Sequence, residues 1–222
     1  MQKNIAFILL LITPFWSFAS EDKAIEEFTL NDQQIILAFE ILDTLESNHL
    51  IKKDYASIRH ESFEVFIDRL DPNKTIFTSE ELVSLLIHAN GNIDLEKDLE
   101  LAFKLFNLYV SRYQERYQRQ IDFLNTAQLE SFDTPRALLR DLSEIERLNS
   151  LDDLNALWID LSTNDVIQLM LSGNTLEEAT TKTIKRMDNQ LNYFLQTRNE
   201  DVFNIFVNAI AVSYTHLRAH ET

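Results

Sequence analysis

Glycine and proline restrict the fold of this chain most, because both are nearly absent from it. Its 222 residues include two glycines, Gly91 and Gly173, and three prolines, Pro14, Pro72 and Pro135. Sheet-rich folds need many tight turns, and those turns use glycine where the backbone angle φ is positive. Hydrophobic residues make up 45% of the chain and charged residues 25%, a balance typical of globular domains. The sequence therefore favours long helices.

Hydrophobic residues recur at intervals of three and four, which is the period of a helix. They predict helices over residues 32–48, 55–69, 79–90, 94–126, 150–172, 175–196 and 199–211. Another predicted helix begins at Thr134-Pro135, where a capping residue precedes a first-turn proline. No segment alternates like a strand, and no internal repeat divides the chain. We expect an all-α domain of about seven to eight helices without a substantial sheet.

Two of these helices carry informative apolar faces. In residues 32–48, the spacing predicts that Ile35, Phe39, Leu42 and Leu45 share the buried face. In residues 94–126, a long stripe is rich in aromatic side chains. Because it follows the helical period, we interpret it as core and not as a ligand platform. Its members are Leu99, Phe103, Phe106, Val110, Tyr113, Tyr117, Ile121 and Leu124.

The first 19 residues are typical of a cleaved signal peptide. Lys3 precedes an apolar run of about twelve residues, and small side chains at Ser17 and Ala19 suit cleavage after Ala19. The run is shorter than the roughly 20 residues that span a bilayer, so we expect no stable membrane span in the mature chain. No cysteine is present, which excludes a disulfide scaffold and lipid attachment at cysteine. We predict an exported protein.

The formal net charge is −16. A balance this acidic repels phosphate backbones, so nucleic-acid binding is not expected.

Residues capable of catalysis or metal binding do not form a recognisable site. No G-x-S-x-G turn occurs, and no serine–lysine pair has a distinguishing context. Oxygen-bearing residues alternate from Asn90 to Asp98 as in a calcium loop, but the glycine is misplaced and a capped helix start fits better. His216 and His220 have the spacing of two zinc ligands on a helix, without the rest of a ligand set. We predict no catalytic residue, metal site or cofactor in this chain.

Several motifs resemble the N-terminal helical region of tail-specific proteases, also called carboxyl-terminal processing peptidases. The segment "RLDPNKTIFTSEEL" is similar to the family's Leu-Asp-Pro-Asn signature before a helix start. "LAFKLFNLYVSRYQERYQ" resembles the following long helix, and "LWIDLSTNDVIQLMLSGNTLEEA" and "NEDVFNIFVNAIA" resemble the closing segments. The resemblance covers roughly residues 28–211. The signature residues, to which we assign a structural role, are Leu70, Asp71, Pro72, Asn73, Phe77, Leu82 and Trp158.

The resemblance implies a secreted serine endopeptidase that acts on proteins with apolar C-termini. In that family a PDZ domain binds the substrate tail and a serine–lysine dyad cleaves it, the lysine acting as base for the serine. Both lie downstream of the matched region, so no residue here is assigned a catalytic role. Residues 20–211 would form a scaffold that packs on the PDZ and protease domains and receives partners such as an adaptor protein. The first alternative is a stand-alone exported helical binding or adaptor module without enzymatic activity, and a third hypothesis is a helical enzyme with a site between helices.

The C-terminal segment "VSYTHLRAHET", residues 212–222, differs in kind from the chain before it. Its letters match the translation of a transposase-based sequencing adapter. We therefore predict that it is an artefact of the library read, either disordered or a helix extension. The apolar period of the preceding helix is expected to stop at Ala211, so that removing residues 212–222 leaves the melting temperature unchanged.

Overall fold

The computed structural model describes residues 26–48, 54–87, 92–132 and 146–216. These residues form seven α-helices and one short 3-10 helix, and they contain no strand, which confirms the all-α prediction. The elements are α1 (Asp32–Asn48), α2 (Tyr55–Leu70), α3 (Ser79–Leu86), α4 (Leu95–Thr126), η2 (Leu129–Phe132), α5 (Leu151–Leu171), α6 (Leu176–Phe194) and α7 (Asn199–His216).

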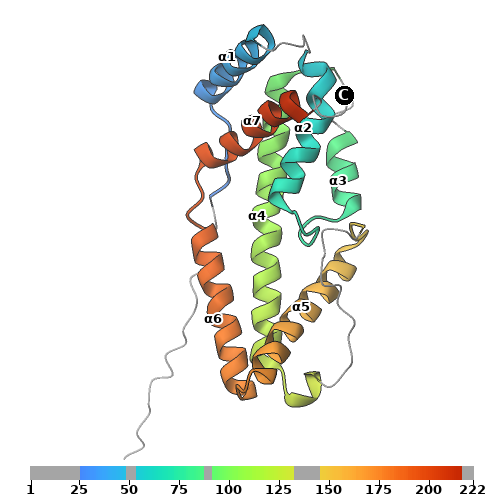
Figure 1. Cartoon of the computed structure of the whole chain (residues 1–222), viewed down its shortest axis with the longest axis vertical. Helices are drawn as coiled ribbons and strands as arrows, with labels where there is room; N and C mark the ends of the chain where they lie inside the picture. The colour runs from blue at the N-terminus through green and yellow to red at the C-terminus, as the bar shows by residue number, and fades with distance from the viewer. Residues whose placement is uncertain (1–25, 49–53, 88–91, 133–145, 217–222) are drawn as a thin grey trace, which may run out of the picture.

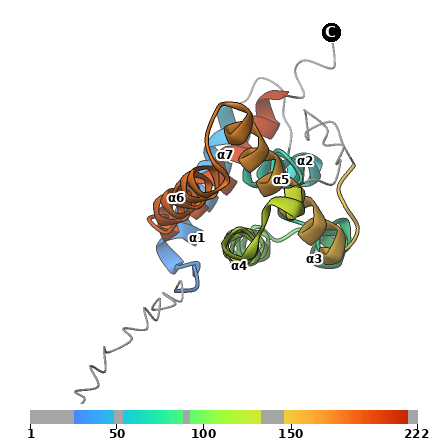
Figure 2. The same ribbon diagram turned by 90° about the horizontal axis from the view of Figure 1, so that it is seen from below.

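The long helix α4 runs through the length of the molecule, and the other helices form two regions, one around each half of α4 (Figure 1). In the upper region, α1, α2, α3 and α7 surround the first half of α4. In the lower region, α5 and α6 pack on its second half and on each other (Figures 1 and 2).

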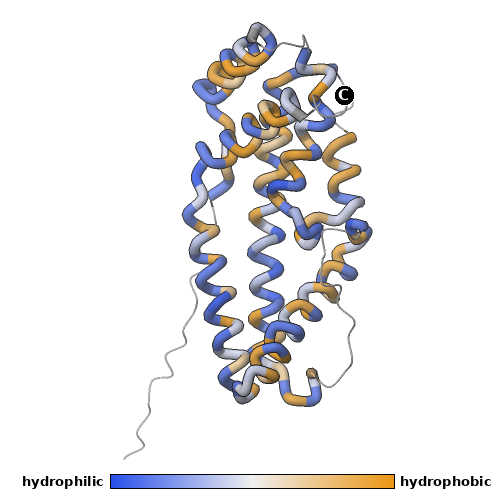
Figure 3. The backbone as a smooth tube through the Cα atoms, viewed as in Figure 1, coloured by the Kyte–Doolittle hydropathy of each residue, from blue (hydrophilic) through white to orange (hydrophobic). Residues whose placement is uncertain are grey.

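The core of the upper region is apolar and rich in aromatic rings. Phe206 of α7 packs against both Phe63 and Phe66 of α2. The centroid of its ring lies 5.1 Å from that of Phe63 and 5.3 Å from that of Phe66. With Ile67 and Leu70, these α2 residues form a buried stripe with the spacing of one helix face. Along α4, the predicted aromatic stripe is also core: Phe106 and Tyr117 are buried. Figure 3 shows apolar residues recurring at intervals along these helices.

The lower core is smaller and more polar. Its buried hydrophobic members are Tyr117, Leu124, Phe132, Val166, Ala179 and Met187. Buried among α4, α5 and α6 are also the polar side chains of Gln120, Ser162, Thr163 and Thr183.

Local capping decides where several helices begin and end. Thr78 and Glu81 form a reciprocal capping box at the start of α3, and Thr175 and Glu178 form another at α6. Gly173 follows α5 with φ of 97°, a conformation that strains any residue with a side chain. The predicted helix starts at residues 79 and 175 and the predicted helix end at residue 172 agree with these elements to within one residue.

The predicted buried face of α1 is wrong at Phe39. This side chain is 49% exposed, whereas Gln34 and Ala38 are buried. Gln34 donates from Nε2 to the carbonyl of Asn199, 3.3 Å away, and exchanges hydrogen bonds with Asn31. These bonds turn Gln34 and Ala38 toward α7, and Phe39 consequently faces outward.

The expectation that the apolar period ends at Ala211 is also wrong. Helix α7 continues to His216, and Tyr214 is only 1% exposed. Tyr214 lies four residues after Ile210 and eight after Phe206, so it extends the same buried stripe. Its hydroxyl donates to Glu46 Oε1 of α1, 3.4 Å away.

Some predictions fall outside the described residues. These are the signal peptide at 1–19, the helix beginning at Thr134-Pro135, the end of the third helix near Asn90-Gly91, and residues 217–222. Among the helices that are described, none is both long and apolar enough to cross a membrane.

Candidate functional site

The predicted signature residues lie in or next to a loop between the two regions. This Asp71 loop, residues 71–78, connects α2 to α3, and Lys74 N–H closes its first turn on the carbonyl of Asp71 at 3.1 Å. The carboxylate of Asp71 is buried and accepts from the backbone N–H groups of Thr75, Ile76 and Phe77, at 2.7, 3.1 and 3.1 Å. One side chain therefore satisfies three successive main-chain donors and fixes the path of the loop.

A cation from the other region completes the charge balance of this loop. Arg147, which precedes α5, forms an ion pair with Asp71 Oδ2 and donates to the carbonyl of Phe77 at 3.2 Å. Its guanidinium also lies 5.9 Å from the centre of the Phe77 ring. Since the side chains of both charged partners are largely buried, removing one would leave the other buried without its counter-charge.

Trp158 of α5 anchors the same loop. Its indole Nε1 donates to the carbonyl of Thr75 at 2.7 Å, across 83 residues of sequence. Arg116 of α4 donates to Thr75 Oγ1 at 3.0 Å, and Gln120 Nε2 donates to the carbonyl of Trp158 at 2.8 Å. The loop is thus bonded to α4 and α5 at once.

The predicted signature residues divide by burial. Leu70, Asp71, Phe77, Leu82 and Trp158 are buried. Pro72 and Asn73 are exposed at the turn, where they contribute conformation. The structure therefore brings Asp71 and Trp158 to one loop.

Sequence reasoning missed three residues of this site: Thr75, Arg116 and Arg147. A buried aspartate requires a cation, which was the available signal, but nothing in the sequence distinguishes Arg147 from the other arginines.

A second ion-pair group flanks the loop at the start of α3. Arg112 pairs with both Glu81 and Glu115, while Glu81 also accepts from the backbone N–H of Thr78 at 3.0 Å. Burial alone would raise the pKa of Glu81, but the hydrogen bonds from Arg112 and Thr78 outweigh it and lower the pKa. Burial, together with the negative charge of Asp71, raises the pKa of Tyr109 to about 12.

The acidic stretch that resembles a calcium loop is a helix start, as predicted. Asp94 caps α4 by accepting from Lys97 N–H. Asp98 is buried and bound by Arg59, with two contacts of 2.6 Å, and by the hydroxyl of Tyr55 at 2.9 Å. Its oxygens are therefore occupied by protein donors.

Within the described part of the chain, no group of three or more potential metal ligands comes together. His216 ends α7, whereas His220 lies beyond the described residues. The hydrogen bonds and the ion pair of the Asp71 loop join its side chains to main-chain groups or to other residues of the site. This arrangement is suited to fixing structure.

An apolar groove lies between α2 and α3. Its volume is about 610 Å³, and its most exposed hydrophobic residues are Val83, Ile87 and Ile93, at 65%, 59% and 55%. Such an exposed apolar surface is typical of a contact site. Ala56, Arg59, His60, Phe63, Leu82 and Leu86 complete the lining.

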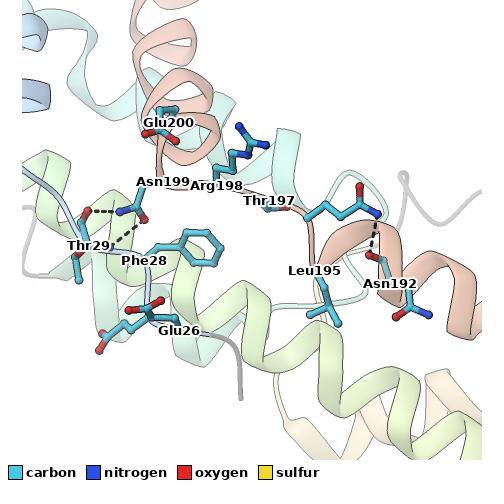
Figure 4. Close-up of a pocket in the computed structure, with 11 residues that line it drawn as sticks. Glu26, Phe28, Thr29, Asn192, Leu195, Thr197, Arg198, Asn199 and Glu200 are labelled. Carbon is cyan, nitrogen blue, oxygen red and sulfur yellow. Dashed lines mark hydrogen bonds between the residues drawn. The ribbon is translucent and has the colours of Figure 1, made fainter. Parts of the chain in front are cut away.

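A larger and more polar hollow of about 830 Å³ lies beside residues 26–29, between that segment and the connection from α6 to α7 (Figure 4). Glu26, Glu27, Arg198 and Glu200 are among the side chains that line it.

Comparison with known proteins connects this fold with one family. Residues 41–215 match the family described as the tail specific protease N-terminal domain. The tail-specific protease of Haemophilus influenzae is 27% identical to this chain over 157 residues, which are 67% of this chain and 22% of that protein. The chain thus spans about a fifth of the length of that curated relative. The matched region includes residues 212–215, and the adapter origin of residues 212–222 stays a prediction.

Proposed function

Because this chain belongs to the tail-specific protease N-terminal domain family, we propose that it is the scaffold and partner-binding domain of a periplasmic serine endopeptidase that degrades or processes proteins from their C-termini. The observation that carries this proposal is the family match over residues 41–215, which contains the whole Asp71 loop and its partners. Asp71 and Trp158 form hydrogen bonds with main-chain groups of that loop and so fix its path, as a scaffold requires.

The groove between α2 and α3 supports a partner-binding role. Three of its side chains, Val83, Ile87 and Ile93, are more than half exposed, and apolar surface of this kind is stabilised by burial against another surface. Under this proposal the partners are the enzyme's own PDZ and protease domains and an adaptor protein. Protein substrates with apolar C-termini would bind to the PDZ domain.

The proposed location is the periplasm, reached through a signal peptide cut after Ala19. Sequencing the N-terminus of the mature protein from a periplasmic extract tests this. Ser20 as the first residue supports the location, and retention of Met1 in the cytoplasm contradicts it.

The gene itself tests the proposed function. We expect the genomic DNA that follows the codon of Ala211 to encode, in frame, a PDZ domain and then a domain with a serine–lysine dyad. A stop codon at that place would contradict the proposal and support a stand-alone exported binding module.

A biochemical assay provides an independent check. The purified chain is expected to leave peptides with apolar C-termini intact, whereas the full gene product cleaves them. Reproducible cleavage by the chain alone would place the catalytic residues inside this domain and overturn the scaffold assignment.

A further inference from the structure

The extended segment at the start of the described chain is held by two asparagine side chains from different helices. Asn107 of α4 accepts from Phe28 N–H at 2.9 Å and donates to the carbonyl of Phe28 at 2.8 Å. Asn199 of α7 accepts from Thr29 N–H at 3.3 Å and donates to the carbonyl of Thr29 at 3.1 Å. The second of these pairs is drawn in Figure 4.

Each asparagine therefore makes the reciprocal pair of hydrogen bonds that a neighbouring β-strand would make. A carboxamide can do this because it carries both a donor and an acceptor, whereas an aspartate carries only acceptors at neutral pH. Four consecutive main-chain groups are satisfied by two side chains. Contacts of this type recognise an extended backbone whatever its sequence.

Phe28 is the most buried side chain of the segment, and Leu30 is partly buried against the same core. Phe28 is 9% exposed and packs edge-on against Phe106 of α4, with ring centroids 5.1 Å apart. The neighbouring Glu26, Glu27 and Thr29 are exposed. The site thus accommodates an aromatic side chain at Phe28 and bonds the N–H and carbonyl groups of Phe28 and Thr29.

The bound segment is open to solvent along one side. The hollow of about 830 Å³ separates it from the connection between α6 and α7 (Figure 4). Glu26, Glu27 and Thr29 are exposed, so these residues of the segment are not covered by packed side chains.

From this geometry we propose that Asn107, Asn199 and the surface of Phe106 form a peptide-binding site, and that residues 26–31 are its intramolecular ligand. The site accepts an extended peptide with one aromatic residue in the place of Phe28. In the intact chain the resident segment excludes such a peptide, since a short tether gives it an effective concentration of roughly millimolar. This proposal does not depend on the proposed function.

The experiment weakens the resident ligand in the full chain and supplies a replacement. The acceptor is the Phe28→Ala chain, and the probe is a fluorescent peptide with the sequence of residues 24–30, measured by anisotropy. We expect the variant to bind the peptide at least about tenfold more tightly than the unchanged chain does, because the tethered competitor has lost its aromatic anchor. A peptide with alanine in place of the phenylalanine is expected not to bind.

Matched variants identify the site. Adding Asn107→Ala to Phe28→Ala should abolish binding, whereas adding Asn208→Ala, which changes an exposed asparagine of α7, should leave it unchanged. Phe39→Ala serves as the control for loss of a phenylalanine elsewhere and should not create binding. The proposal is overturned if the folded Phe28→Ala chain binds no peptide at millimolar concentration, or if binding survives Asn107→Ala.

A second measurement applies if Phe28→Ala does not fold. Hydrogen exchange in the chain with an intact Phe28 should show protected amides at Phe28 and Thr29. Asn107→Ala should raise the exchange rate of the Phe28 amide at least about tenfold, and Asn199→Ala should do the same for the Thr29 amide. The exchange rates of the α2 amides should stay unchanged. Equal exchange in these variants and the unchanged chain would show that the two asparagines do not hold the segment.

Discussion

The upper and lower regions share the helix α4 but are stabilised differently. In the upper region, aromatic and aliphatic side chains from α2, α4 and α7 fill the core. In the lower region, the hydrophobic core is small and buried hydroxyl and amide groups lie among α4, α5 and α6. Burial of apolar surface is the main source of stability, and a buried polar atom without a partner costs free energy. The comparison indicates that the upper region resists unfolding more strongly.

The Asp71 loop explains how two unequal regions can form one domain. Its aspartate belongs to the α2–α3 connection, while Arg147 and Trp158 come from the segment that includes α5. The predicted signature residues Asp71 and Trp158 therefore lie where the lower region is bonded to the upper one.

The largest expected effect comes from the upper core. Phe206→Ala should destabilise the protein by about 3–5 kcal/mol, because it removes a fully buried ring that contacts Phe63 and Phe66. Phe132→Ala, which removes a buried phenylalanine of the lower core, should cost less. Urea denaturation of both variants gives the two values. An equal or larger cost at Phe132 would remove the distinction between the regions.

The end of α7 provides the next largest effect and reverses the expectation from sequence. Tyr214→Ala should cost about 3 kcal/mol, because this side chain is buried with the upper core. Truncation after Ala211 should consequently lower the melting temperature by several degrees. Tyr193→Ala, which changes a tyrosine that is 79% exposed, is the control and should shift stability by less than about 0.5 kcal/mol. An unchanged melting temperature after truncation would show that residues 212–216 add nothing to the fold.

These two effects show what the sequence could and could not predict. Helix starts at Thr78 and Thr175 were predictable because a cap is a local pattern of four residues. The period of residues 94–126 likewise identified the buried stripe of α4. The face of α1 was misjudged because Gln34 is held by Asn199, 165 residues away.

The site follows the same rule. The sequence identified Asp71 and Trp158 separately, as parts of a signature. Their meeting, and the choice of Arg147 as the counter-charge 76 residues from Asp71, depend on how the helices pack. Pairings over such distances leave no periodic or local pattern in a single sequence.

A stabilising change is expected in the lower core. Thr183 is fully buried, and its hydroxyl has no hydrogen-bond partner among the described residues. Thr183→Val keeps the shape and removes the unsatisfied group, and it should stabilise the protein by about 1 kcal/mol. Thr180→Val is the matched control: the Thr180 hydroxyl donates to the carbonyl of Leu176 at 2.9 Å, so this change should not stabilise. Thermal unfolding measures both. Loss of stability in Thr183→Val would mean that the hydroxyl is satisfied in solution.

The smallest effect is a pH dependence at the start of α3. The folded protein holds the pKa of Glu81 below its ordinary value of 4.5, so the unfolded chain binds a proton there more readily. The contribution to stability is complete above pH 4.5 and is lost as the pH falls through the lower, folded pKa. Glu81→Gln should reduce the stability lost between pH 6 and pH 3 by less than about 1 kcal/mol. Identical pH profiles of urea midpoints for the two chains would exclude this contribution.

Hydrogen exchange of the Trp158→Phe protein tests most directly whether the Asp71 loop bonds the two regions together. The substitution keeps an aromatic ring and removes the indole donor to the carbonyl of Thr75, a change of about 1–1.5 kcal/mol. We predict that amides of α5 exchange roughly tenfold faster than in the unchanged protein, while amides of α2 keep their rates. Unchanged exchange in α5, or an equal increase in α2 and α5, would contradict the account.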